Sequence, residues 1–138
     1  MKIRDLMSRN IDYVTAEETI EQAAAKMKES NVGDMPVVVG GEAVGMLTDR
    51  DITIRIAAHG LDPQKTHVSD AMTEGIVACK EDDDVEVAAR LMGENQVRRL
   101  LVVEDGGKLS GVVSLGDLAT SVSEELTGDV LKKISMPT

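Results

Sequence analysis

The sequence predicts a mixed α/β (α+β) fold built from two copies of one β-α-β-β-α repeat. The first observation behind this prediction is an internal repeat. After a shift of 65 positions, residues 5–39 and 70–104 share 11 identities over 35 positions, where unrelated segments would share roughly two. The second observation is that each copy contains short β-branched runs, typical of strands, and one stretch with apolar residues every three or four positions, typical of a helix.

Each copy begins with a predicted strand and a predicted helix. In the first copy, residues 11–14 form a short apolar run that indicates a strand. Residues 17–30 then place Ile20, Ala23, Ala24 and Met27 at helical spacing, and Thr15 is the polar residue expected to cap this helix. The corresponding segments of the second copy are residues 76–79 and 85–94.

A hairpin and the start of another helix complete each copy. Residues 35–39 and 43–47 are apolar runs on either side of Gly40-Gly41, a dipeptide that favours a tight turn. Thr48 then opens a helix. The corresponding parts of the second copy are residues 100–104, the turn at 105–108, residues 109–113 and a helix from Ser114.

These elements define the expected domain organisation. We expect the repeats at residues 1–58 and 68–122, a connecting loop at 59–67 that is rich in Gly, Pro and polar residues, and a helical tail at 123–138. Half of a 138-residue chain buries little surface. We therefore expect the two repeats to pack through their sheets about a pseudo-twofold axis as one folding unit. The tail is predicted to break or bend near Gly128, and its apolar stripe to cap the module or to meet a partner.

Composition and charge exclude several classes of protein. The formal net charge is −10, which disfavours extended nucleic-acid binding but leaves room for a small anion in a local arginine pocket. No apolar run is long enough to span a membrane, and the charged N-terminus lacks a signal-peptide pattern, so we expect a cytoplasmic protein. Cys79 is the single cysteine, and we interpret it as a small buried hydrophobe and expect no metal site.

The junction between the hairpin and the following helix carries the most informative motif. GMLTDRDI (45–52) and GVVSLGDL (111–118) share a glycine, a hydroxyl residue at the helix start and an aspartate three residues later. The hydroxyl lies where a phosphate is favoured, and the aspartate can accept hydrogen bonds from ribose hydroxyls. The alternative is a capping box formed by Thr48 with Asp51 and by Ser114 with Asp117. Both interpretations stay open, because a duplication also copies a cap.

Together these features resemble a known family. The doubled β-α-β-β-α unit, its DLMS (5–8) and DAMT (70–73) starts, the two junctions and the strands MPVVV (35–39) and LLVVE (100–104) resemble the cystathionine-β-synthase (CBS) domain in its tandem form, the Bateman module. The resemblance spans about residues 1–122. It implies a non-enzymatic regulatory module that requires no cofactor and binds AMP, ADP, ATP or S-adenosylmethionine in clefts between the repeats.

The resemblance also implies which residues bind the ligand. Asp51 and Asp117 match the acids that hold ribose hydroxyls, and Thr48 and Ser114 match the hydroxyls near the phosphate. Candidate phosphate partners, by position and charge, are Arg50, Arg98 and Arg99. Each cleft is expected to combine the acid of one repeat with the first strand of the other, with adenine between aliphatic side chains. The two groups are Asp117 with Ser8, Ile11, Asp12 and Val32, and Asp51 with Thr73, Ile76, Val77 and Val97.

The two clefts are expected to be unequal. Gly33-Asp34 in the first copy stands where the second copy has Arg98-Arg99, and Pro36 stands where the second copy has Leu101. Because a carboxylate repels phosphate, the Asp117 cleft is predicted to be the better site for phosphorylated ligands.

The resulting functional prediction is a homodimeric regulatory protein that converts ligand occupancy into a change of shape or of contact with an unknown protein partner. The alternative is a dimerising scaffold whose clefts are degenerate and bind no ligand. A hydrolase is disfavoured, because the sequence offers no evident pairing of a nucleophile with a base.

Overall fold

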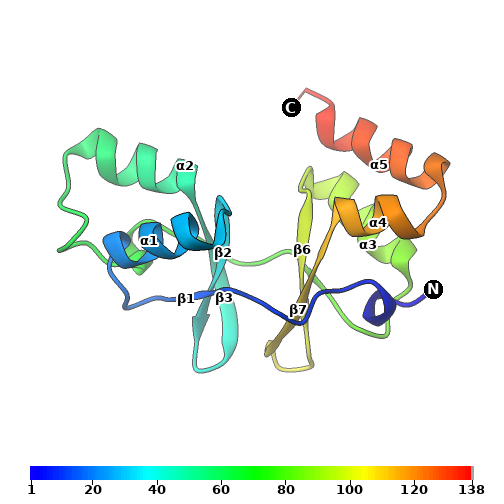
Figure 1. Ribbon diagram of the computed structural model, residues 1–138, viewed down its shortest axis with the longest axis horizontal. Helices are drawn as coiled ribbons and strands as arrows, with labels where there is room; N and C mark the ends of the chain where they lie inside the picture. Colours follow the sequence, from blue (N-terminus) through cyan, green and yellow to red (C-terminus); the bar gives the residue numbers. More distant parts are fainter. Residues whose placement is uncertain (138) are drawn as a thin grey trace. The chain divides into compact units, whose positions relative to one another are not determined.

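The computed structural model describes residues 1–137 and separates into two compact units (Figure 1). The continuous unit consists of residues 12–76, and the split unit combines residues 1–11 with the chain from residue 77 onward. The chain passes between the units after Ile11 and after Ile76, which occupy the same position in the two repeats. The start of each repeat therefore folds with the body of the other repeat.

Each unit is built on a small sheet. The continuous unit has the strand order β1-β2-β3-β4, with β1 parallel to β2 and the other pairs antiparallel. The split unit has the order β5-β6-β7, again with a parallel first pair and an antiparallel second pair. The strands are β1 (Val14–Thr15), β2 (Asp34–Val39), β3 (Glu42–Thr48), β4 (Thr73–Glu74), β5 (Ala78–Cys79), β6 (Arg99–Val103) and β7 (Leu109–Ser114). The predicted α/β fold class with a hairpin in each repeat is confirmed.

The two hairpins share an irregularity in their pairing. The register shifts between Val37 and Val38 in one hairpin and between Val102 and Val103 in the other, at equivalent positions. The predicted turn at Gly40-Gly41 is confirmed, with φ values of 59° and 84° that glycine adopts without strain.

The first strand of each repeat is shorter than predicted. Parallel pairing begins only at Val14 in β1 and at Ala78 in β5. The residues before these strands lie where the chain enters the unit, and of these Val77 still accepts a hydrogen bond through its carbonyl from Leu101 N of β6, at 3.3 Å. The strand predicted over residues 76–79 was therefore too long, and the strand predicted over residues 11–14 began too early and ended one residue before the end of β1.

Two equivalent helices cover these sheets, α1 (Ile20–Ser30) and α3 (Val85–Asn95). The predicted start of the first helix at residue 17 with a Thr15 cap was wrong. Thr15 belongs to β1, and its carbonyl accepts a hydrogen bond from Glu18 N in a separate turn. Thr19 is the N-cap, because its hydroxyl accepts from Gln22 N at 3.2 Å.

The helical segments after the hairpins differ. In the continuous unit, α2 (Asp49–Asp51) passes into the π-helical turn η2 (Ile52–Ile56) and the 3-10 turn η3 (Ala57–His59). In the split unit, α4 (Leu115–Ser121) is an ordinary α-helix. The predicted connecting loop at 59–67 packs on the start of α1, where Ile20 N donates to Thr66 O at 2.9 Å.

The predicted tail helix exists, but its break is elsewhere. Val122 is extended, with φ −120° and ψ 176°, and α5 (Glu124–Ser135) begins after the N-cap Ser123, whose hydroxyl accepts from Leu126 N. Gly128 lies within α5, so the expected break near Gly128 was wrong. The serine cap, followed by Glu124 and Glu125 in the first turn, starts a new helix there. Figure 1 shows α5 (red and orange) beside α3 and α4.

The starts of the repeats contribute to both hydrophobic cores. Ile3 is fully buried among side chains of the split unit, including Val85 and Met92. Its equivalent, Val68, is fully buried in the continuous unit among side chains that include Ile20 and Met27. These buried residues attach each repeat start to the core that the other repeat forms.

Candidate functional site

The junction motif forms the same capping box in both units. Thr48 N donates to Asp51 Oδ2 at 3.0 Å, and Thr48 Oγ1 accepts from Asp51 N at 3.0 Å. Ser114 N donates to Asp117 Oδ2 at 2.8 Å, and Ser114 Oγ accepts from Asp117 N at 3.1 Å. The capping interpretation of the motif is therefore confirmed. The box also holds each carboxylate in a fixed orientation, with Oδ2 engaged by the backbone.

The glycine of the motif leaves the space that a neighbouring backbone segment occupies. Ser8 and Val112 exchange two backbone hydrogen bonds, each of 2.9 Å, beside Gly111. A Cβ on Gly111 would lie 2.7 Å from Ser8 O, and a Cβ on Gly45 would overlap the carbonyl oxygen of Thr73 in the equivalent place. Backbone rather than ligand thus explains the close approach that the glycine permits.

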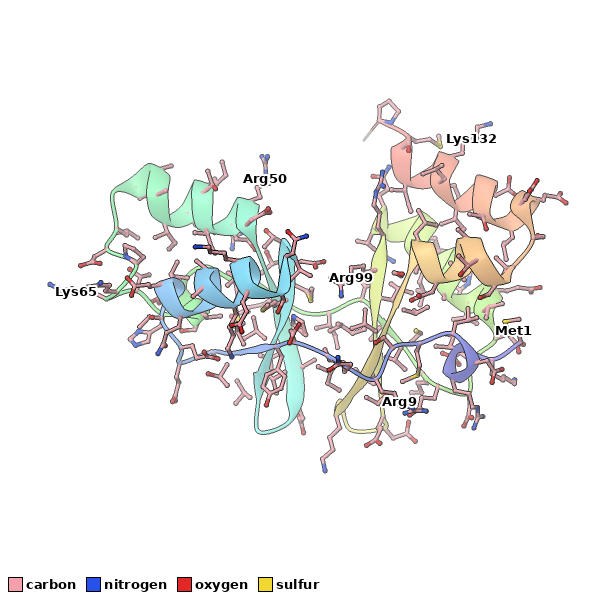
Figure 2. All side chains as sticks on the ribbon, in the orientation of Figure 1. Met1, Arg9, Arg50, Lys65, Arg99 and Lys132 are labelled. Carbon is pink, nitrogen blue, oxygen red and sulfur yellow. The ribbon has the colours of Figure 1, made fainter. Side chains whose placement is uncertain are left out.

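In the split unit the junction opens into a pocket of about 440 Å³. Leu115 N donates to Arg98 O at 2.8 Å, which ties the start of α4 to the start of β6. This bond brings the two predicted arginines beside Ser114, and Figure 2 shows Arg99 beside β6. The residues that line the pocket are Arg98, Arg99, Ser114, Leu115, Gly116, Ala119, Thr127 and Leu131.

The equivalent place in the continuous unit carries the opposite charge. Asp49 N donates to Gly33 O at 2.8 Å, the counterpart of the bond that ties Leu115 to Arg98. The Asp49 carboxylate lies so close to Gly33 that a Cβ there would be 2.8 Å from Asp49 Oδ2. Asp34 stands where the split unit has Arg99, and the arginines near this junction are Arg50, which Figure 2 labels near the start of α2, and Arg55. An anion therefore meets a more repulsive environment at this junction.

Asp51 has an additional basic neighbour. Arg55 Nε lies 3.9 Å from Asp51 Oδ1. The same guanidinium donates through Nη1 to Ala71 O at 3.0 Å and to Met72 O at 2.9 Å, so Arg55 links the Asp51 carboxylate to the segment that precedes β4. The equivalent position in the split unit is Ser121, which is too short to form such a link.

The remaining predicted residues are divided between the units. Of the group expected with Asp117, Ser8 and Ile11 lie in the same split unit, whereas Asp12 and Val32 lie in the continuous unit. The group expected with Asp51 divides in the same way: Thr73 and Ile76 lie with Asp51 in the continuous unit, and Val77 and Val97 lie in the split unit. In each group the structure thus places the acid and two of its four predicted partners in the same unit.

Sequence reasoning missed three kinds of contributor to these junctions. Asp49 could have been found by aligning it with Leu115, because the repeat offset pairs them directly. Thr127 and Leu131 lie beyond the duplicated part of the chain, so comparison of the two copies gives no signal for them. Arg55 could have been found as the i,i+4 partner of Asp51, whereas its bonds to distant backbone carbonyls leave no signal in the sequence.

Other ionisable groups lie outside the pocket. The acidic run at 81–84 forms ion pairs with the N-terminal segment, among them Lys2 with Asp84 at 3.1 Å and Arg4 with Asp82. Burial, with a smaller contribution from Asp83, raises the pKa of the Cys79 thiol to about 12. The thiol is therefore neutral at ordinary pH, as expected of a small buried hydrophobe.

Residues 1–137 contain neither a candidate metal cluster nor a candidate membrane-spanning helix. No cluster of three or more His, Cys, Asp or Glu side chains in this part of the chain is arranged to hold a metal ion. None of the helices formed there has both the length and the apolar character needed to cross a bilayer.

Comparison with known proteins gives a consistent match. The CBS domain family model matches residues 3–58 and 68–124. The chain is 43% identical over 134 residues to the CBS domain-containing protein YhcV of Bacillus subtilis, an alignment that covers 96% of this chain and 94% of YhcV.

Solved structures give the same result. The conserved CBS domain protein TA0289 of Thermoplasma acidophilum has a TM-score of 0.80 at 29% identity, covering 96% of this chain and 75% of TA0289. The crystal structure of CBSX2 in complex with AMP has a TM-score of 0.75 at 27% identity, covering 87% of this chain and 94% of CBSX2.

Proposed function

This chain belongs to the CBS domain family and contains two such domains, and from this premise we propose that it is a regulatory module that binds an adenosine nucleotide. The observation that carries the proposal is the pocket of the split unit, which Arg98, Arg99 and Ser114 line together. Guanidinium groups form strong, directional hydrogen bonds with phosphate oxygens. The AMP complex of the similar protein CBSX2 supports an adenosine nucleotide as the ligand.

Each group of predicted residues has a role in this proposal. In the split unit, Arg98, Arg99 and Ser114 bind the phosphate and Asp117 accepts hydrogen bonds from the ribose. Ser8, Ile11, Asp12 and Val32 surround the adenine. The related group in which Asp51 replaces Asp117, with Thr48, Arg50, Thr73, Ile76, Val77 and Val97, forms a second and weaker site. Its weakness follows from the acids Asp34 and Asp49 at the phosphate position.

The proposal includes the cellular role. The protein is non-enzymatic, requires no cofactor, acts in the cytoplasm, and forms a homodimer that changes its contacts with a protein partner when ligand binds. Ligand produces this change only if it binds the two conformations with unequal affinity.

Isothermal titration calorimetry with AMP on the full chain tests the proposed site. We expect Arg98→Ala to weaken binding at the stronger site at least about tenfold, because a charge-assisted hydrogen bond contributes about 1.5–3 kcal/mol. The matched control is Arg50→Ala, which removes the arginine near the other junction and should leave the stronger site unchanged. Absence of binding by AMP, ADP, ATP and S-adenosylmethionine would contradict the proposal, and so would equal losses in the two variants.

A second function, a dimerising scaffold without ligand, is favoured by one observation. Large apolar side chains are exposed in the described part of the chain, including Val39 at 53% and Ile54 at 48%. Under this alternative, Asp51→Ala and Asp117→Ala leave self-association and partner binding unchanged, and no adenosine compound raises the melting temperature.

A further inference from the structure

The start of each repeat is bound to its unit by the same backbone hydrogen bonds. We name residues 1–9, in the split unit, the N-terminal strap, and the equivalent residues 66–74, in the continuous unit, the internal strap. The equivalent bonds, written from donor to acceptor, are Ile3 N to Asp83 O at 2.9 Å and Val85 N to Met1 O at 3.0 Å in the split unit, and Val68 N to Glu18 O at 2.8 Å and Ile20 N to Thr66 O at 2.9 Å in the continuous unit. Backbone bonding therefore does not distinguish the two straps.

The N-terminal strap adds three ion pairs whose equivalents the internal strap lacks the residues to form. Each pair joins a basic residue of the strap to the acidic run at 81–84: Lys2 with Asp84 at 3.1 Å, Arg4 with Asp82, and Arg9, which Figure 2 labels, with Glu81 at 2.5 Å. The equivalent combinations in the continuous unit are His67 with Thr19, Ser69 with Glu17, and Glu74 with Ala16. None of them joins a basic residue to an acid.

The acidic run depends on the N-terminal strap for its counter-charge. Its four adjacent carboxylates repel one another, and three of them have their basic partner on the strap. The fourth, Asp83, accepts a hydrogen bond from Lys80 N at 2.9 Å. The side chains of the strap carry a net charge of +2, and those of the run carry −4. Attraction between the two segments therefore supplements the individual pairs.

These ion pairs are accessible to salt. The side chains of Arg4 and Asp82 are 49% and 80% exposed, and that of Arg9 is 60% exposed. The screening length decreases from about 30 Å at 0.01 M salt to about 3 Å at 1 M, so salt weakens the attraction between exposed charges. The whole chain carries −10, and screening of this self-repulsion stabilises the rest of the fold. Salt thus acts on the N-terminal strap in the opposite direction.

The N-terminal strap covers the outer edge of β7. Ser8 and Val112 exchange two backbone hydrogen bonds, and the Met7 side chain lies where a Cβ on Gly111 would be. Release of the strap leaves the N–H and C=O groups of Val112 without these bonds. An exposed edge of this kind can pair with another extended segment.

We infer that the N-terminal strap is a conformational device held closed by charge: salt opens it locally and uncovers the edge of β7, whereas the internal strap stays closed. The inference stands on the ion pairs and the backbone bonds of the strap, and it is independent of the proposed nucleotide site.

Amide hydrogen exchange measured by NMR on the full chain, in 20 mM and in 500 mM NaCl, tests the inference. We expect the amides of Ile3 and Val85, which bond to or from the N-terminal strap, to exchange about fivefold faster or more at the higher salt concentration. The equivalent amides of Val68 and Ile20 should exchange at an unchanged or lower rate. Equal acceleration in the two straps would overturn the inference, as would an N-terminal strap that does not respond to salt.

A double variant tests whether charge closes the strap. Arg4→Gln with Arg9→Gln removes two ion pairs and keeps long polar side chains. Exchange of the Ile3 amide should then be about fivefold faster or more already in 20 mM NaCl, with most of the salt response lost. Arg90→Gln is the matched control, because it removes an exposed pair with Glu94 on α3 and should leave the strap unchanged. A double variant that keeps the wild-type salt response would contradict the inference.

Discussion

The two units share a scaffold but complete it differently. Both have the same capping box, the same shifted hairpin register and a left-handed helix end, at Asn31 with φ 54° and at Gln96 with φ 53°. In the split unit, α5 covers α3. In the continuous unit, no helix between residues 12 and 76 packs in the same way on α1. The duplication thus preserved backbone features, whereas individual side chains determine which surfaces are covered.

Two pairs of equivalent positions show why α5 packs on α3 whereas α1 has no such partner helix among residues 12–76. Ala89 on α3 is 3% exposed, whereas its equivalent Ala24 on α1 is exposed. Gly93 lies close to α5, because a Cβ there would be 2.8 Å from Lys133 Cδ. Its equivalent on α1 is Lys28, a long exposed side chain. A glycine on one helix and a lysine on the other explain why one helix accepts a partner helix at this position.

The largest expected effect concerns the exchanged starts of the repeats. Ile3→Ala should reduce the free energy of unfolding by about 3 kcal/mol, and the equivalent Val68→Ala by about 2 kcal/mol, because each leaves a cavity in a fully packed core. Chemical denaturation measures both values. Methyl NMR distinguishes the two cores, since Met92 lies in the core with Ile3 and Met27 in the core with Val68.

We expect Ile3→Ala to shift the Met92 methyl resonance more than that of Met27, and Val68→Ala to do the reverse. The opposite pattern would show that each repeat start packs with its own repeat. That result would contradict the division of the chain after Ile11 and Ile76.

The second-largest expected effect on stability concerns the packing of α5 on α3. Gly93→Lys introduces the residue of the first repeat beneath α5, and we expect a loss of about 2 kcal/mol, because the new side chain must displace Lys133 and separate the two helices. Thermal and chemical denaturation measure the loss. Gly128→Ala is the control. Gly128 lies within α5 with no atom within 4 Å of a built Cβ, so alanine should stabilise the protein by about 0.5–1 kcal/mol. An unchanged stability for Gly93→Lys would mean that this close contact does not hold α5 in place.

Much of this fold could be predicted from the sequence because the duplication doubles each local signal. The Gly40-Gly41 turn and the apolar spacing of α1 are determined by residues close in sequence, so periodicity and turn chemistry identify them. The start of α1 was misplaced, because Thr15 and Thr19 are both acceptable caps and only pairing of β1 with β2 selects Thr19. The exchange of repeat starts depends on contacts distant in sequence, which local patterns do not encode.

Three of the residues that line the pocket could be predicted from the repeat. Arg98, Arg99 and Ser114 were identified from the repeat, the charge and the family resemblance, and the structure places them around one pocket. Leu131 enters the pocket from a helix that has no second copy for comparison. Its position in the pocket depends on how α5 packs on α3, which the amphipathic pattern of the tail alone does not fix.

The smallest effect tests the first strands of the two repeats, where Cys79 occupies the place of Val14. Cys79 is 3% exposed, and Sγ lies 3.6 Å from Leu101 O. Burial raises the pKa of its thiol from an ordinary value of 9.0 to about 12. The folded state therefore keeps a proton that the unfolded state releases above pH 9. The contribution of this thiol to the free energy of unfolding is therefore fully present below pH 9 and is lost as the pH rises toward 12.

By pH 10 this group alone should lower the free energy of unfolding by about 1.4 kcal/mol. Cys79→Val, which introduces the residue of the first repeat, should remove this part of the pH dependence, and so should Cys79→Ala. Urea denaturation of the wild type and both variants at pH 8 and pH 10 measures the difference between the three proteins. Identical losses in all three proteins would mean that the thiol ionises as readily in the folded state as in the unfolded chain. The first strand of the split unit would then be more accessible to water than its equivalent around Val14.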